Sequence, residues 1–274
     1  MSGKPASMRF LTDGVVQMIH KGLAFVLILS SPSFAFDGQP LHYEIDWGPV
    51  TLADATVQLL DSGNVRSVNA DIASRGVGAW FSDFQSTLEI LRTGDGVQVL
   101  NADSTWGDTL SNITVLWQPL DPKPTVDFYR SKPRDYELTP VPEESIVNTI
   151  DPFTPVFEIG RQLEETKRCA GSYRIFDGVR RYDLAITDGG SVILQADKPG
   201  NFSGQAYRCD MTVARIGGFS TKKGWFRIGE PEITRTLYLG NIRGHWLPVR
   251  FEISAPLGVA VARLMADRRT VASQ

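Results

Sequence analysis

Along most of the chain, apolar residues alternate with polar ones in short runs, which is the pattern of a half-buried β-strand. The first run places Leu41, Tyr43, Ile45 and Trp47 on one face. The same period of two returns in four later runs, at residues 113–117, 182–186, 209–213 and 249–253. Each run predicts a strand that buries one side, so the chain is expected to be mainly β.

Turn residues separate these runs. Thr93–Gly96, Phe176–Gly178 and Asp188–Gly190 combine Gly with Asp, the residues that tight hairpin turns need for positive φ. The proline-rich stretch 119–142 is interpreted as an irregular strand pair, because prolines are accepted in edge strands and turns. The predicted topology is antiparallel and sequential.

A short segment breaks the period of two. Val77, Trp80, Phe81 and Phe84 are spaced at i, i+3, i+4 and i+7, which is the spacing of one helical face. We therefore expect a short helix that packs on the sheet.

A longer segment predicts an amphipathic helix that opens at Asp151, a good N-cap, with Pro152 in the first turn. Its apolar stripe ends near Gly171 and consists of Phe153, Val156, Phe157, Gly160 and Leu163. Such a helix in an antiparallel β protein needs a concave surface to cover. The predicted fold is a strongly curved antiparallel sheet or open β-barrel with this helix on its concave side, and a flat sandwich with a peripheral helix is the competing architecture.

The N-terminus has the features of a secretory signal peptide. Lys21 precedes the apolar run 23–29, and Ser33 and Ala35 form a small-residue cleavage site. We expect cleavage near Ala35, which leaves residues 36–274 as a single mainly-β domain; the alternative is an uncleaved membrane anchor. No apolar run after residue 35 approaches the length that spans a bilayer.

The chain has two cysteines, Cys169 and Cys209. In an exported protein such a pair predicts a disulfide. Because Cys169 follows the predicted helix and Cys209 lies in a predicted strand, the bond should tie the helix to the sheet.

Charge and motifs exclude several function classes. The net charge of −3 becomes about −5 without the signal, and no arginine-rich block is present, so no nucleic-acid partner is expected. The sequence lacks zinc-ligand spacings, a nucleophile elbow, a phosphate loop and a dinucleotide fingerprint. His42 and His245, the histidines after residue 35, are interpreted as surface residues. We therefore expect no enzyme, no metal, no cofactor and no catalytic residues.

The richest polar cluster consists of Asp177, Arg180, Arg181 and Asp183. Two arginines beside a hairpin offer forked donors to an anion or a carboxylate. The alternative interpretation is structural, namely an Asp-Gly turn followed by an outward row of charges.

Several motifs resemble the domain-of-unknown-function 3108 family. They are Trp47–Val50, Asp151–Pro152, Cys169–Gly171, Ile175–Leu184, Tyr207–Cys209, Gly217–Phe219, Leu247–Arg250 and Ala255–Gly258. The resemblance implies an exported, mostly β protein of the Gram-negative envelope, located in the periplasm, with no established activity.

These observations favour a non-catalytic protein that binds an apolar envelope molecule such as a lipid. Candidate ligand-lining residues are Tyr43, Trp47, Trp117, Phe153 and Phe157, because mouths of β-barrels are common ligand sites. The alternatives are an envelope assembly factor that acts through protein contacts and an uncharacterised hydrolase.

Overall fold

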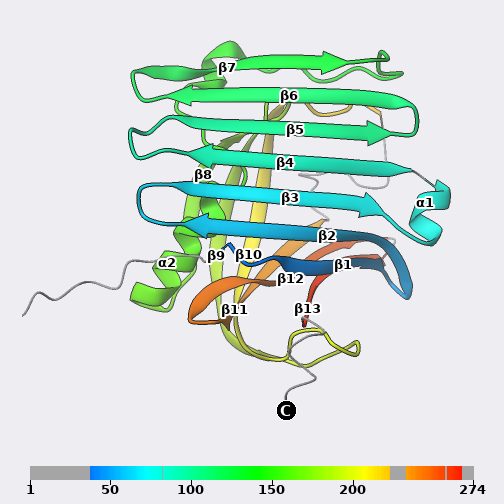
Figure 1. The fold of residues 1–274 in the computed structure, drawn as a ribbon, viewed down its shortest axis with the longest axis vertical. Helices are drawn as coiled ribbons and strands as arrows, with labels where there is room; N and C mark the ends of the chain where they lie inside the picture. The colour runs from blue at the N-terminus through cyan, green and yellow to red at the C-terminus, as the bar shows by residue number, and fades with distance from the viewer. Residues whose placement is uncertain (1–37, 82, 223–232, 257, 267–274) are drawn as a thin grey trace, which may run out of the picture. The chain divides into compact units, whose positions relative to one another are not determined.

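One antiparallel sheet contains all the strands in the computed structural model, which describes residues 38–81, 83–222, 233–256 and 258–266 (Figure 1). The predicted signal peptide, 1–35, lies outside the described residues. The strands are β1 Leu41–Trp47, β2 Val50–Asp61, β3 Arg66–Ser74, β4 Phe84–Arg92, β5 Gln98–Trp106, β6 Thr109–Gln118, β7 Asp121–Arg130, β8 Gly171–Phe176, β9 Arg181–Leu194, β10 Gly204–Gly217, β11 Thr234–Ile242, β12 His245–Ala255 and β13 Gly258–Met265. The helices are α1 Val77–Phe81, a 3₁₀ turn Glu143–Ile146 and α2 Thr154–Thr166.

The strand order is β7-β6-β5-β4-β3-β2-β1-β13-β12-β11-β10-β9-β8. Each strand pairs with a chain neighbour except at the centre, where the first strand pairs with the last. Within the described residues the edge strands β7 and β8 do not pair with each other, so the sheet is not closed into a barrel. The antiparallel prediction is confirmed, and a single continuous sheet replaces the competing two-sheet sandwich.

One face of this sheet is continuous across all its strands, because directly opposed residues of an antiparallel pair lie on the same face. Tyr43 opposes Leu264 across β1 and β13, and Phe251 opposes Leu237 across β12 and β11. We call this face the inner face. On β2 to β6 it presents a straight row of opposed buried apolar side chains: Leu59, Val68, Ile90, Leu100 and Val115.

Helix α2 packs on the inner face and contacts strands from both halves of the sheet. Its Phe157 belongs to the same buried cluster as the row on β2 to β6. Ile159 and Leu163 belong to a second cluster with inner-face residues of β9 and β11, such as Leu184 and Leu237. A single helix can contact both ends of one face only if the sheet curves around it. The predicted helix on the concave side is therefore confirmed.

The ends of α2 differ from the sequence prediction. Asp151 Oδ1 accepts hydrogen bonds from the backbone N–H groups of Phe153 (2.6 Å) and Thr154 (3.0 Å), which forms a turn just before the helix. Helical geometry therefore begins at Thr154. It ends at Thr166 because Lys167 adopts a left-handed conformation with φ 58°, well before the predicted end near Gly171.

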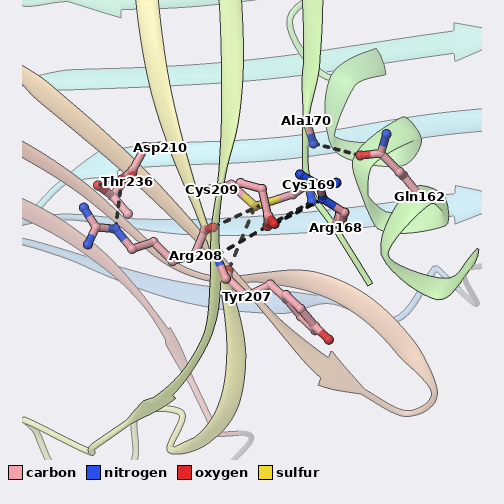
Figure 2. Close-up of a disulfide and its surroundings, with 11 residues drawn as sticks. Gln162, Arg168, Cys169, Ala170, Tyr207, Arg208, Cys209, Asp210 and Thr236 are labelled. Carbon is pink, nitrogen blue, oxygen red and sulfur yellow. Dashed lines mark hydrogen bonds and ion pairs between the residues drawn. A yellow bond between two sulfur atoms is a disulfide. The ribbon is translucent and has the colours of Figure 1, made fainter. Parts of the chain in front are cut away.

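The disulfide between Cys169 and Cys209 joins the segment after α2 to β10, with a Cα–Cα distance of 5.8 Å (Figure 2). Both cysteines are fully buried. The connection is fixed further by Gln162 Oε1 of the helix, which accepts a hydrogen bond from the Ala170 N–H (2.8 Å; Figure 2). The predicted disulfide from helix to sheet is confirmed.

The short helix α1 forms where it was predicted and packs on the sheet at β2, but Trp80 and Phe84 do not form the predicted buried helical face. Trp80 is 87% exposed, and Phe84 already belongs to β4. The helix approaches β2 through Gly78, where a Cβ atom would lie 2.2 Å from the Leu52 carbonyl oxygen. Backbone contact at this glycine leaves Trp80 on the outside.

The segment Asp188–Gly190 is a bulge inside β9, which corrects its prediction as a hairpin turn. Two residues of β9, Gly189 and Gly190, stand against one residue of β10, Arg208, since Ser191 opposes Tyr207 and Asp188 opposes Cys209. Gly190 has φ 78°, the left-handed conformation that a bulge and a tight turn both require. Asp and Gly are common in both features, which is why the sequence predicted a hairpin turn where the structure has a bulge.

The proline-rich stretch forms one strand in place of the predicted pair. Pro122 and Pro124 lie in β7, whose outer edge needs no partner for the missing N–H groups. Residues 131–142 contain no strand and cross to the far side of the sheet, where Leu138 bridges to Ser220.

Candidate ligand-binding cleft

A cleft of about 790 Å³ lies on the inner face of β4 to β7. We call it the inner cleft. Its opposite wall is made of the turn between β8 and β9, the end of β10 with residues 218–222, and the segment 134–138. Pro152, just before α2, also lines it, so the cleft begins where the helix stops covering the sheet.

The floor of the inner cleft consists of two rows of opposed residues that run across four strands. The first row is apolar: Leu88, Ala102, Ile113 and Phe128. The second row lies one step further from the core and is polar: Ser86, Ser104, Ser111 and Arg130. The fully buried row that includes Leu100 and Val115 lies on the other side of the apolar row. The floor therefore changes from apolar to polar between these two rows, and the apolar side chain of Phe84 lines the cleft beyond the second row.

The turn between β8 and β9 forms the wall that faces β6. Asp177 Oδ1 accepts hydrogen bonds from the N–H groups of Val179 (3.0 Å) and Arg180 (2.7 Å). Gly178 has φ 90°, and a Cβ atom there would lie 2.4 Å from Cγ2 of Ile113. Because glycine has no Cβ, the turn rests directly on the floor of the cleft.

Cationic side chains surround the opening. Five of them line the inner cleft against a single carboxylate, Asp177; they are Arg130, Arg134, Arg180, Arg215 and Lys222. The chain as a whole carries a net charge of −3, so this excess of positive charge is local. Asp177 pairs with Arg180 Nε at 2.8 Å, and its charge raises the pKa of that guanidinium.

The other cations contact aromatic rings or polar groups. The guanidinium of Arg134 lies 5.1 Å from the ring centroid of Phe128, and that of Arg215 lies 4.3 Å from the ring centroid of Phe219. Arg130 donates to Ser111 Oγ (3.0 Å) and to the Lys132 carbonyl (2.9 Å). These contacts hold the cationic groups at the mouth of the cleft.

The five residues predicted to line a ligand site lie outside the inner cleft. Tyr43, Trp117, Phe153 and Phe157 belong to or pack against the main core cluster. Tyr43 donates a hydrogen bond to the Pro248 carbonyl (2.8 Å), and burial raises the pKa of its hydroxyl. Trp47, half-buried, packs beside Gly258 at the start of β13. Four of the five side chains therefore belong to the packing of the main core.

The predicted polar cluster is divided between the cleft and the protein interior. Asp177 and Arg180 line the inner cleft. Arg181 is 3% exposed, donates to the Ser145 carbonyl (2.7 Å) and pairs with Asp183 (2.6 Å). The expected outward row of charges is therefore wrong for Arg181, which anchors the 3₁₀ turn to β9.

Sequence reasoning missed Arg130, Arg134 and Arg215. They come from separate segments, and no local motif connects them. The serine row was missed for the same reason, since the residues meet only through strand register. A signal existed in retrospect: Ser86, Ser104 and Ser111 each stand two positions from an apolar inner-face residue.

The two histidines of the described part of the chain lie outside the inner cleft. His42 is exposed and hydrogen-bonds to Thr56 Oγ1 (3.1 Å), while His245 Nδ1 lies 3.7 Å from Glu164. Among the described residues, no group of three or more His, Cys, Asp or Glu side chains is placed to hold a metal ion. None of the helices there is long and apolar enough to cross a membrane.

No protein-family model matches the chain, and no curated protein matches it. Among solved structures, it is similar to the crystal structure of a beta-barrel-like protein of domain of unknown function DUF1849 from Brucella abortus, with a TM-score of 0.54. Identity is 12%, over 83% of this chain and 95% of that chain. This likeness supports the fold alone. The resemblance to the domain-of-unknown-function 3108 family stays a prediction.

Proposed function

We propose that the protein is an exported, non-catalytic binding protein of the periplasm that holds an apolar envelope molecule, such as a lipid, in the inner cleft. The observation that carries this proposal is the cleft itself. Its volume of about 790 Å³ lies within the usual range for ligand pockets, and an apolar row crosses its floor.

The apolar row beside a polar row favours an amphiphile over a wholly apolar ligand. A hydrocarbon chain laid on Leu88, Ala102 and Ile113 would be removed from water, while the serine row can hydrogen-bond to a polar end. The disulfide supports location in an oxidising compartment, where such bonds form and persist.

The test is native mass spectrometry of protein purified from a membrane-containing host. We expect a co-purified lipid on the wild type. The substitution Ser104→Trp places an indole in the cleft and should abolish lipid retention. The matched control is Thr87→Trp on the neighbouring strand, because Thr87 is exposed on the opposite face of the sheet.

Retention by Ser104→Trp equal to that of the control would contradict the proposal. If the wild type carries no lipid and binds none when lipid is added, the binding function is wrong. The alternative of an envelope assembly factor would then take its place.

A further inference from the structure

Two arginines, Arg130 and Arg134, line the inner cleft beside its serine row. Arg130 is the last member of the serine row, and Phe128, two residues earlier, is the last member of the apolar row. Both side chains lie on one face of β7, with Cα atoms about 7 Å apart. Arg134 lies over the Phe128 ring, so two guanidinium groups stand where the apolar floor becomes polar.

The charge of these two groups is available to a ligand. Arg180 is paired with Asp177, and Lys222 is paired with Asp135 at 2.7 Å. Among the described residues, no carboxylate forms an ion pair with Arg130 or Arg134, although the charge of Arg130 acts at longer range on Asp135 and helps to lower the pKa of that carboxyl group. Stacking on a ring holds a guanidinium plane in place and leaves its in-plane N–H groups able to donate.

We infer that the inner cleft recognises an anionic amphiphile, whose phosphate or carboxylate head binds at Arg130 and Arg134 while its hydrocarbon chain lies on the apolar row. This inference rests on the proposed function and adds the chemical class and orientation of the ligand. Guanidinium groups bind both head groups through paired N–H donors, so the two share one recognition chemistry. A neutral head would gain only hydrogen bonds to the serines.

The test is isothermal titration calorimetry of the full chain with four ligands at about 50 mM NaCl, where charge screening is weak. The ligands are dodecyl phosphate, laurate, neutral monolauroylglycerol and inorganic phosphate, and the amphiphiles are kept below their micelle concentrations. We expect the anionic amphiphiles to bind about tenfold or more tightly than monolauroylglycerol.

The double variant Arg130→Gln/Arg134→Gln should lose this preference, so that its affinities for dodecyl phosphate and monolauroylglycerol become similar, and a cooperative thermal unfolding transition reports that it is folded. The control is Arg161→Gln, which removes the same kind of charge from an exposed position on α2. Its preference should match that of the wild type. In the wild type, raising the salt to about 500 mM should reduce the preference.

Each other outcome overturns the inference. Equal affinity for anionic and neutral amphiphiles would remove the anion site and leave the proposed function intact. Binding of inorganic phosphate as tightly as dodecyl phosphate would indicate a free-anion site in place of an amphiphile site. Failure of every amphiphile to bind would contradict both this inference and the proposed function.

Discussion

At the scale of single residues, Phe157 is one of the side chains that hold α2 against the inner face of the sheet. It is 4% exposed and belongs to the core cluster that contains Val68, Leu100 and Val115. Phe157→Ala should lower the free energy of unfolding by about 3 to 5 kcal/mol, because it leaves a cavity. Urea denaturation measures this loss. Val156→Ala, at a half-buried position one residue earlier, should cost clearly less; equal costs would place the helix outside the core.

Asp197 predicts how stability depends on acid. Its carboxylate accepts hydrogen bonds from Arg263 Nε (2.9 Å) and Nη2 (2.8 Å) and pairs with Arg250 (2.9 Å). The hydrogen bonds from Arg263, aided by the charges of both arginines, hold its pKa at about 2, against the usual 3.8. Because the folded state has the lower pKa, the stabilisation is present above pH 3.8 and is lost as the pH falls toward 2.

The variant Asp197→Asn should therefore be less stable than the wild type at neutral pH and should lose less stability between about pH 4 and pH 2. Urea midpoints across this range measure the difference. Asp127→Asn, at an exposed position of β7, serves as the control and should follow the wild-type profile. An unchanged acid profile for Asp197→Asn would show that this ion pair does not contribute to stability.

At the scale of elements, the disulfide fixes the end of α2 to β10. Its loop has a sequence separation of 40, which corresponds to roughly 4 kcal/mol in the chain-entropy estimate. Cys169→Ala/Cys209→Ala should lower the denaturation midpoint by about the amount that a reductant lowers the midpoint of the wild type. The reductant should have no effect on the double variant. A wild type insensitive to reduction would show that the bond does not constrain the unfolded chain.

The turn between β8 and β9 allows a second prediction at this scale, about the stability cost of replacing Gly178. Gly178→Ala introduces both a strained φ and a clash with Ile113, whereas Gly63→Ala introduces a similar φ strain with nothing within 4 Å. Gly178→Ala should therefore be the more destabilising of the two, by about 1 to 3 kcal/mol. Thermal unfolding and lipid retention measured together test this. Equal losses of stability would mean that the turn does not press on the floor of the cleft.

Local sequence patterns predicted the strands and helices better than they predicted which residues of different strands lie together. Alternation revealed the strands, and the stripe from Phe153 to Leu163 revealed α2, because each pattern depends on neighbours in sequence. Asp188–Gly190 was misread, since bulges and hairpin turns use the same residues. Asp177 and Arg180 were found because the turn is local. Arg130 and Arg134 were not, because their place in the cleft depends on strand register and on the curve of the sheet.

At the scale of the whole molecule, curvature creates the site. The inner face is covered by α2 near the fully buried row and left open over the two rows of the cleft. The opposite wall comes from β8 to β10, the last part of the same sheet. A sheet that curves without closing can therefore hold a packed core and a ligand cleft on one face.

The most direct test of this account is a crystal structure with 12-bromododecyl phosphate, in which anomalous scattering locates the bromine. The account predicts a bromine peak in the inner cleft on the apolar row, near Ala102 and Ile113, with the phosphate beside Arg130 and Arg134. A peak elsewhere on the protein, or an empty cleft in crystals of protein that binds the compound in solution, would contradict it.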